Sequence, residues 1–381
     1  MTVVDPTQIR TLPTTLQLSG ECRLMKLAHL EIDDPRWRKA LSRLRHDFYN
    51  LPEYVRLGGE SIGAQPRAFI ATAGDKELFI PYLLRRCDLL FPEAPTAVKV
   101  YDVVSPYGYP GLLLSDAARE SPDFAREAMD GLCKTLREQG VCSAFFRLNP
   151  LLSNGISALF PAKFFGPASK TVAIDLAQDE AAIWKGLRSG HQWVINKCRK
   201  LGFVPRVAPL RDEIDSFMGV YQETMNRVNA RDAYYFSRDY FARLADMPEH
   251  VHCCVVEFEG EQAAACLFFE CDGIVQAHLG GTRSKFMNKS PFHLVLHHLA
   301  LWAKSRSNRY LHLGGGVGGS DDGVLEFKRG FSELTFSFLT LRLIIDEDKY
   351  RNLAALSAHP AKIPVEDVLR RDYFPVYRAP R

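Results

Sequence analysis

One order of predicted elements occurs twice along the chain. A hairpin, a strand, a helix and a strand follow one another, and the helix starts at Ser121-Pro122 in the first copy and at Ser290-Pro291 in the second. Proline in the first turn is typical of a helix start. The hairpins are expected at 67–84 and 251–270, and the strands at 97–104, 141–148, 274–281 and 309–315. The repeat predicts an α/β (α+β) protein of two similar domains in tandem, each a mixed sheet flanked by helices.

The length of 381 residues is sufficient for two domains that each bury a core. A polar N-terminal segment at 1–20 is expected to be a loose lead-in. We expect an N-terminal domain at 21–165 and a C-terminal domain, which carries the chemistry, at 166–348. A proline-containing tail at 349–381 is expected to pack back on the N-terminal domain.

The composition excludes several classes of protein. With 46% hydrophobic and 24% charged residues the chain is not globally disordered, and a net charge of +3 is too small for a histone-like polycation. The nine cysteines include no C-x-x-C pair, so we expect free thiols and no structural zinc site. The N-terminal residues lack a signal-peptide pattern, and no stretch of about 18 apolar residues occurs. These features predict a cytoplasmic protein without a transmembrane segment.

Basic residues gather in the middle of the chain. Between Lys185 and Arg211 there are seven Lys or Arg residues and no acidic residue. Apolar residues at helical spacing direct Lys197, Arg199 and Lys200 outward. Such a face suits a polyphosphate or an RNA backbone, and it is also typical of a solvated helix.

A glycine-rich loop follows the strand at 309–315. It contains the pattern G-x-G-x-x-G at Gly314, Gly316 and Gly319. A dinucleotide site requires a helix directly after such a loop, whereas about eight residues separate this loop from the next predicted strand. We therefore expect the loop to line a substrate cleft, with a plain turn and dinucleotide binding as alternatives.

Two further segments combine aromatic side chains with glycine or with basic residues. Tyr107, Gly108 and Tyr109 follow a predicted strand, where a loop can carry binding groups or form a packed turn. A second cluster lies at and after a helix end and comprises Arg227, Arg231, Tyr234 and Tyr235.

Lys328 comes shortly after the glycine-rich loop, next to Phe327. A cation at this place can neutralise a phosphate or a developing oxyanion, or it can be a solvated surface charge. His293 and His297 are one helical turn apart, but no third ligand is identifiable, so we predict no metal site. No signature of a serine or cysteine nucleophile is present.

The run 278–332 resembles the Fem-type branch of the GNAT acyltransferase superfamily. Supporting pieces occur in the family's order over roughly 45–345, and they are VVSPYGYPG, AFFRLNPLL, HQWVINKCRKLG and ETMNRVNARDAYYFS. The resemblance implies two tandem GNAT-like domains and transfer of an acyl group onto an amine. Classical members transfer an amino acid from aminoacyl-tRNA to a peptidoglycan precursor, whereas short members look like general N-acyltransferases that include users of acyl-CoA.

The resemblance also implies roles for particular residues. The family's Phe-Lys pair falls on Phe327 and Lys328, of which the lysine acts in transfer. An arginine that contacts acceptor phosphates falls on Arg227 or Arg231. RSKFMNKS stands in place of the pyrophosphate loop of ordinary GNAT proteins.

The expected function is therefore N-acyl transfer from an activated ester or thioester, with acyl-CoA or aminoacyl-tRNA as co-substrate and no tightly bound cofactor. The acceptor is an amine of a small molecule, of an amino sugar, or of a lipid- or nucleotide-linked cell-wall precursor. Donor phosphates are expected at Lys285, Lys289 and Lys197. The acceptor cleft is expected to be lined by Tyr107, Gly108, Tyr109, Tyr235, Gly314, Gly316 and Gly319. The alternative is a non-catalytic RNA- or polyanion-binding protein on the same scaffold.

Overall fold

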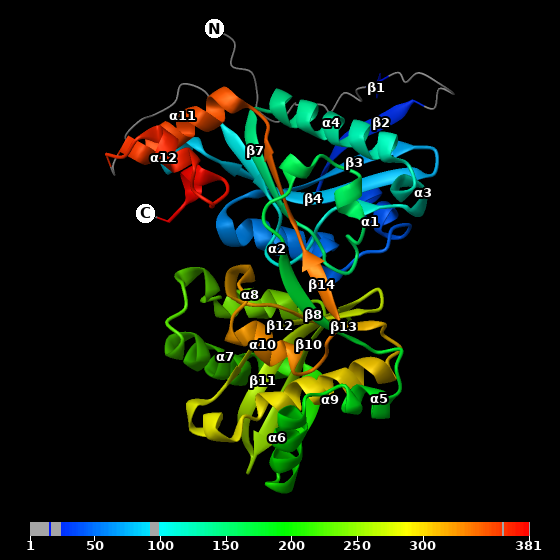
Figure 1. The fold of residues 1–381 in the computed structure, drawn as a ribbon, viewed down its shortest axis with the longest axis vertical. Coiled ribbons are helices and arrows are strands. Elements are labelled where there is room, and N and C mark those ends of the chain that lie inside the picture. The colour runs from blue at the N-terminus through cyan, green and yellow to red at the C-terminus, as the bar shows by residue number, and fades with distance from the viewer. Residues whose placement is uncertain (1–14, 17–23, 92–98, 360–361, 381) are drawn as a thin grey trace. The chain divides into compact units, whose positions relative to one another are not determined.

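The computed structural model describes residues 15–16, 24–91, 99–359 and 362–380, so the expected lead-in at 1–20 lies outside them apart from Thr15–Leu16. The chain divides into two compact units (Figure 1). The first unit comprises Met1–Arg45, Tyr49–Pro167 and Leu339–Arg381, and the second comprises His46–Phe48 and Ala168–Phe338. The division expected from the sequence stays a prediction. It differs from these units in placing 166–167 and 339–348 with the second domain and 46–48 with the first.

The first unit contains a mixed sheet with the strand order β1-β2-β3-β4-β5-β7-β15, in which β6 pairs with β4. Strands β5 and β7 are parallel, and the other neighbours are antiparallel. The strands are β1 (Thr15–Leu16), β2 (Met25–Glu31), β3 (Gln65–Ala73), β4 (Lys76–Arg86), β5 (Tyr101–Val104), β6 (Leu113–Leu114), β7 (Val141–Arg147) and β15 (Thr340–Ile344). The helices are α1 (Pro35–Leu41), α2 (Pro52–Ile62), α3 (Asp116–Arg119), α4 (Pro122–Glu138), α11 (Glu347–Ala358) and α12 (Val365–Leu369).

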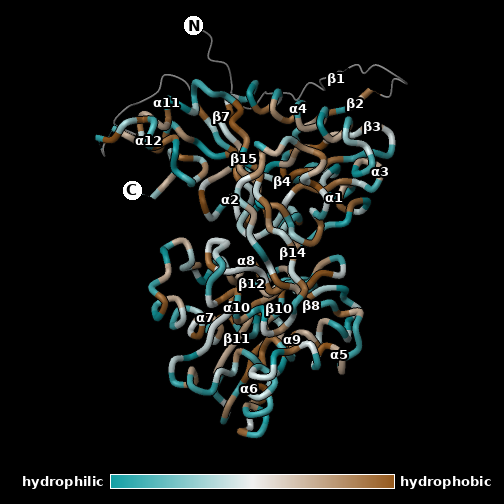
Figure 2. The backbone as a smooth tube through the Cα atoms, in the orientation of Figure 1, coloured by the Kyte–Doolittle hydropathy of each residue, from teal (hydrophilic) through white to brown (hydrophobic). Residues whose placement is uncertain are grey.

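Helix α4 covers this sheet with one apolar face. It begins at Pro122, whose fixed φ and missing N–H suit the first turn. Phe124, Ala128 and Leu132 recur every four residues and are buried in the core of the first unit. Figure 2 shows both hydrophilic and hydrophobic residues along α4, as expected for a helix with one buried side.

The C-terminal part of the chain belongs to the first unit. Strand β15 pairs antiparallel with β7 and buries Leu341 and Leu343 in the core of that unit. The segments that follow, α11, α12 and the turn Val376–Arg378, form a further apolar cluster around Tyr350 and Tyr377.

The second unit contains a mixed sheet with the strand order β14-β8-β13-β12-β11-β10-β9. Strands β12 and β13 are parallel, and the other neighbours are antiparallel. The strands are β8 (Ser169–Asp175), β9 (Val204–Pro209), β10 (Val251–Phe258), β11 (Glu261–Cys271), β12 (Ile274–Thr282), β13 (Tyr310–Gly315) and β14 (Thr335–Phe338). The helices are α5 (Glu180–Lys185), α6 (Ser189–Lys200), α7 (Leu210–Arg227), α8 (Arg238–Ala245), α9 (Phe292–Ser305) and α10 (Gly323–Arg329).

Helices α7 and α9 cover opposite faces of this second sheet and approach β12 closely. A Cβ atom at Gly280 would lie 2.7 Å from the Phe292 ring of α9, and one at Gly281 would lie 2.3 Å from Thr224 Oγ1 of α7. Successive residues of a strand face opposite sides of the sheet. The predicted fold class is confirmed, since each unit is a mixed sheet flanked by helices. Within the described ranges, no helix has both the length and the apolar character needed to cross a membrane.

Candidate active site

The two parallel strands β12 and β13 separate part-way along their length. They pair at three positions, Ile274 with Tyr310, Val275 with Leu311, and Gln276 with His312. Beyond the last pair, β12 continues to Thr282 beside β11, and β13 continues to Gly315 beside β8. The strands therefore form a fork that opens after Gln276 and His312.

Each arm of this fork contains an extra residue directly beyond the last pair. Along β12, Ala277 pairs with Phe268 and Leu279 pairs with Leu267, so that His278 is the extra residue. Along β13, His312 pairs with Ala173 and Gly314 pairs with Val172, which makes Leu313 the extra residue. A β-bulge bends its strand and redirects side chains, and two bulges at one level promote the separation.

Lys328 lies at the tip of the fork, where its β13 arm ends. It belongs to the last turn of α10, and its Nζ donates a hydrogen bond of 2.6 Å to the carbonyl oxygen of Gly315 at the end of β13. Desolvation lowers the pKa of Lys328 from 10.5 to about 8, although Asp322 and Cys266 oppose the change. Burial raises the pKa of Cys266 to about 12, so the nearby thiol stays neutral. The fork therefore ends in a desolvated ammonium group.

A chain of buried polar side chains lies at the base of the fork. Gln276 Nε2 donates to Asp47 Oδ2 at 2.6 Å, and Gln276 Oε1 lies 2.6 Å from His312 Nδ1. Burial, followed by the charge of Lys328, lowers the pKa of His312 to about 3. Burial likewise lowers the pKa of His278 to about 3. Both imidazoles are therefore neutral at physiological pH.

The glycine-rich loop is the turn that positions α10. Gly314 has φ +77° and Gly319 has φ +86°, and a Cβ atom at Gly316 would lie 2.0 Å from the carbonyl oxygen of Ser320. Asp322 accepts hydrogen bonds from three backbone N–H groups, those of Val317, Val324 and Leu325. The loop therefore closes on the cap of α10 and holds the helix that carries Lys328. The helix has seven residues, unlike the long crossover helix of a dinucleotide fold.

Comparison with known proteins agrees with this geometry. Residues 188–329 match the family model described as the acetyltransferase (GNAT) domain. The matched residues lie within the second unit. No curated protein matches the chain significantly.

Solved structures extend the likeness to both units. FemX is similar over 85% of this chain and 99% of its own, with a TM-score of 0.65 at 10% identity. A conserved protein of unknown function from Bacteroides thetaiotaomicron VPI-5482 covers 83% of this chain and 99% of its own, with a TM-score of 0.52 at 9% identity. A tandem GNAT protein from the clavulanic acid biosynthesis pathway covers 84% and 98%, with a TM-score of 0.47 at 10% identity. The predicted resemblance to Fem-type GNAT proteins is confirmed at the level of the fold.

Phe327 belongs to an aromatic cluster of the second unit. Its ring centroid lies 4.9 Å from that of His293 and 5.3 Å from that of Phe331. The Nε2 atom of His191 lies 2.9 Å from the Phe327 carbonyl oxygen. The cluster anchors α10 against α6 and α9, so the geometry gives Phe327 a structural task beside Lys328. Among the described residues, no group of three or more His, Cys, Asp or Glu could hold a metal ion.

Arg227 lies beyond the end of β12, whereas Arg231 and Tyr235, which follow α7, are exposed. Arg227 Nη1 donates to the Thr282 carbonyl oxygen and to Ser284 Oγ, each at 3.1 Å. Arg231 is exposed, and the Tyr235 hydroxyl donates to Asn226 Oδ1 at 3.0 Å. Arg227 thus binds the end of the β12 arm of the fork, and acceptor binding by Arg227, Arg231 and Tyr235 stays a prediction.

The lysines predicted to bind donor phosphates lie on two segments. Lys285 forms an ion pair with Glu261, which competes with any phosphate. Lys289 is joined to α6 through its carbonyl oxygen, which accepts from Cys198 Sγ at 3.3 Å. Lys197 lies over the exposed ring of Trp193, with its Nζ 4.8 Å from the ring centroid. Their role as phosphate ligands stays a prediction.

The basic stretch between 185 and 211 is partly neutralised in the folded chain. Three of its arginines form ion pairs with acidic residues from other segments: Arg188 with Glu326, Arg206 with Glu213 and Glu257, and Arg211 with Asp246. The acid-free run of the sequence is therefore not an acid-free surface.

Tyr107, Gly108 and Tyr109 lie in the first unit. The loop is a tight turn, with φ +94° at Gly108, where a Cβ atom would lie 2.3 Å from the Tyr49 ring. The Tyr54 hydroxyl donates to the Tyr107 carbonyl oxygen at 3.1 Å, and the Tyr107 side chain is 41% exposed. Their place at an acceptor cleft stays a prediction.

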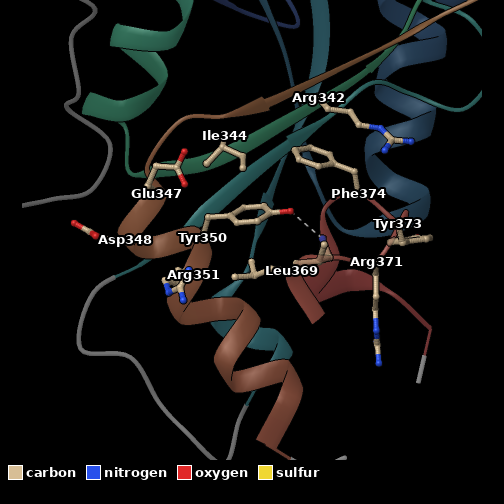
Figure 3. A pocket seen from close by; sticks show the side chains of 11 residues that line it. Arg342, Ile344, Glu347, Asp348, Tyr350, Arg351, Leu369, Arg371, Tyr373 and Phe374 are labelled. Carbon is tan, nitrogen blue, oxygen red and sulfur yellow. Dashed lines mark hydrogen bonds between the residues drawn. The ribbon is translucent and has the colours of Figure 1, made fainter. Parts of the chain in front are cut away.

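The first unit also has a hollow of about 510 Å³ beside β15, α11 and the C-terminal residues (Figure 3). Arg342, Arg351 and Arg371 line it together with Glu347 and Asp348. Because the lining carries both positive and negative side chains, it does not indicate a particular class of ligand. All residues predicted for the site are among the described residues, and none of them lines this hollow.

The polar chain at the base of the fork was not expected from the sequence. Gln276 and His312 each interrupt an otherwise apolar strand, and this was the available signal. Asp47 precedes Gln276 by more than two hundred residues, and nothing in its neighbourhood indicates a contact with the second domain.

Proposed function

We propose that the chain is a GNAT-type N-acyltransferase that moves an acyl group from an activated thioester or ester to an amine, with the reaction at the fork between β12 and β13. The single observation that carries this proposal is the desolvated Lys328 ammonium at the tip of the fork, bound to the Gly315 carbonyl oxygen. The match of 188–329 to the acetyltransferase domain supports it.

The fork suits an extended donor with amide groups. Beyond Gln276 and His312, the facing edges of β12 and β13 form no ladder with each other. An extended chain entering between them can pair with strand edges in the manner of an added strand. The arm of acyl-CoA contains two amides in an extended chain, so we favour acyl-CoA over aminoacyl-tRNA as donor.

In the proposed reaction a neutral amine attacks the carbonyl carbon of the donor. A bond forms between nitrogen and carbon, and the carbonyl oxygen becomes an oxyanion that the Lys328 ammonium stabilises. The carbon–sulfur bond then breaks, and the proton lost from the amine ends on the departing thiolate. An activated acyl group held next to the amine needs little further assistance.

The carboxylates nearest to this site are engaged elsewhere. Asp322 caps α10, and although desolvation opposes the change, three N–H groups lower its pKa. Asp321 accepts from Arg329 at 3.1 Å. Neither is assigned as the base, and the amine enters in its neutral form.

We place the activity in the cytoplasm, where acyl-CoA is available and thiols stay reduced. The eight cysteines of the described residues are free thiols, in keeping with this location. The acceptor is an amine of a small molecule or of a lipid- or nucleotide-linked precursor, and a phosphate on it would suit the exposed Arg231.

The test is incubation of the protein with radiolabelled acetyl-CoA and, separately, with aminoacylated tRNA, in the presence of a panel of amines that includes polyamines, amino sugars and nucleotide-linked muropeptides. Acceptor-dependent loss of label from acetyl-CoA, reduced in Lys328→Met and retained in Lys304→Met, is the expected result. Loss of the aminoacyl group from the charged tRNA alone would show that aminoacyl-tRNA, and not acyl-CoA, is the donor. Salt-sensitive RNA binding without transfer from either donor would favour the polyanion-binding alternative.

A further inference from the structure

The polar chain at the base of the fork has fixed hydrogen-bond directions. Gln276 Nε2 donates to Asp47 Oδ2, so the amide turns its NH₂ group toward Asp47 and its oxygen toward His312. The Gln276 oxygen also only accepts, so His312 donates from Nδ1 over 2.6 Å. A neutral imidazole has one N–H, and Nε2 therefore carries the lone pair. Asp47 thus determines the tautomer of His312 through Gln276.

This chain lies on the last pair before the strands separate. Gln276 and His312 form the final rung of a ladder that has three rungs. Asp47 belongs to the three-residue segment His46–Phe48, which is part of the second unit. That segment is anchored, because the Phe48 ring stacks on Phe269 at 3.9 Å and the His46 N–H donates to Asp272 at 3.1 Å.

The three side chains of this polar chain are buried, so their hydrogen bonds are shielded from solvent. Asp47 and His312 are 0% exposed and Gln276 is 1% exposed. Asp47 also accepts from the Phe48 N–H at 2.6 Å. A buried polar group that loses one of its partners has no bulk water to replace that partner, so loss of any member of the polar chain weakens the arrangement. Parallel ladders are slightly less stable per residue than antiparallel ones, so a parallel ladder of three pairs gains support from a hydrogen bond between the side chains of its last pair.

We propose that Asp47, Gln276 and His312 form a clamp that keeps β12 and β13 paired as far as Gln276 and His312 and holds His312 in the Nδ1–H tautomer. These three are therefore positioning residues for transfer at Lys328. The clamp rests on the proposed function for its purpose. Without it, the ladder opens toward Ile274 and Tyr310, and the arm that ends in Gly315 moves. Gly315 provides the carbonyl oxygen that holds Nζ, so the ammonium of Lys328 moves with it.

The first test reads the tautomer directly. We would record two-bond ¹H–¹⁵N spectra of ¹⁵N-histidine-labelled protein between pH 6 and 9, and assign His312 by its loss in His312→Gln. We expect a neutral ring with Nδ1 protonated throughout. In Asp47→Asn, where the side-chain amide can donate to Gln276, we expect a population with the proton on Nε2. An Nε2–H ring or an imidazolium in the unaltered protein would overturn the proposal.

The second test measures whether β12 and β13 stay paired at Gln276 and His312. Gln276→Leu keeps the side-chain volume and removes both hydrogen bonds. Leu311 and His312 are paired with β12 on one side and with β8 on the other, so their successive N–H groups point to opposite neighbours. We expect amide hydrogen exchange to accelerate at least tenfold at the one of the two whose N–H points toward β12, while exchange at the other and at the paired strands β10 and β11 is unchanged. Unchanged protection of the rung would overturn the clamp.

Gln262→Leu is the matched control. Gln262 is another buried glutamine of the same sheet, and its Nε2 donates to Glu213 Oε2 at 3.2 Å. It lies outside the ladder of β12 and β13. Its replacement should lower stability without accelerating exchange at Leu311 and His312.

Kinetics then connect the clamp to transfer. With a donor that gives turnover, Gln276→Leu should raise KM for the donor and lower kcat severalfold, and Gln262→Leu should leave both near the unaltered values. Equal kinetic effects of the two variants would show a merely structural role. If no donor gives turnover, the spectra and the exchange rates still decide on the clamp, and only the proposed function fails.

Discussion

Replacement of Lys328 by methionine should remove activity and at the same time stabilise the protein. The side chain of methionine retains most of the apolar length of lysine, while the ammonium is lost. A fall of the pKa from 10.5 to about 8 means that the folded protein binds this proton less tightly than the unfolded chain. At about 1.4 kcal/mol for each tenfold change, the charged lysine costs about 3 kcal/mol below pH 8.

The sign of the pH dependence follows from the same values. Between about pH 8 and 10.5 the unfolded chain binds more protons than the folded one, so the free energy of unfolding of the unaltered protein rises with pH in this range. Lys328→Met lacks this rise. Loss of the hydrogen bond to Gly315 offsets about 1.5 kcal/mol, so the variant should be about 1.5 kcal/mol more stable at pH 7.

The measurement is urea unfolding of both proteins at pH 7, 8 and 9, with kcat/KM determined on the same preparations. The stability advantage of Lys328→Met should shrink by about 1 kcal/mol between pH 7 and 9. The activity should fall by about 10²–10³-fold, as for loss of one oxyanion donor. Lys304→Met is the control, because Lys304 Nζ also donates to a backbone carbonyl oxygen, that of Leu176 at 3.1 Å. A pH-independent difference between Lys328→Met and the unaltered protein would refute desolvation of the ammonium.

Three further variants test the supports of the two units. Asp322→Ala should lower the free energy of unfolding by about 1–2 kcal/mol through loss of the α10 cap, whereas Asp321→Ala should have little effect, as thermal unfolding can show. Gly316→Ala should cost about 1–3 kcal/mol, because its Cβ meets a backbone oxygen at 2.0 Å, while Gly323→Ala, with no atom within 4 Å, should be tolerated in the same assay. Asp102→Asn should cost about 3–5 kcal/mol in urea unfolding, since this carboxylate is 0% exposed and binds two arginines, and an unchanged midpoint would contradict its pairing.

Elements with a strong local signal could be predicted from the sequence. The helix expected from Ser290-Pro291 is α9, Phe292–Ser305, and the hairpin expected at 251–270 is formed by β10 and β11. Proline at a helix start and turn residues between two apolar runs act within a few residues, which is why they can be read without a fold.

The end of the second domain shows what a local pattern does not decide. The run 335–345 has the composition of one strand, but the structure divides it into β14 in the second sheet and β15 in the first. Alternation of apolar residues predicts that a segment pairs and does not name its partner. The boundary at 348 was therefore expected several residues after the point where the chain leaves the second unit.

One residue of the candidate site, Lys328, could be proposed from the sequence, whereas the surroundings of that residue could not. The resemblance indicated Lys328, but spacing alone did not distinguish a solvated cation from a desolvated one. Desolvation arises because the Asp322 cap turns α10 so that the lysine meets Gly315. The clamp required three segments far apart in the sequence to meet, which local patterns cannot show.

The pairing of β15 with β7 has a consequence for the order in which this chain folds during synthesis. All strands of the second sheet lie between 169 and 338, so that sheet can be complete when residue 338 has left the ribosome. The first sheet begins earlier but must wait for Thr340–Ile344 to supply its last strand. The domain that is started first is thus finished last. A nascent chain stalled before residue 340 would have a complete second sheet, whereas its first sheet would lack β15, the strand that pairs with β7.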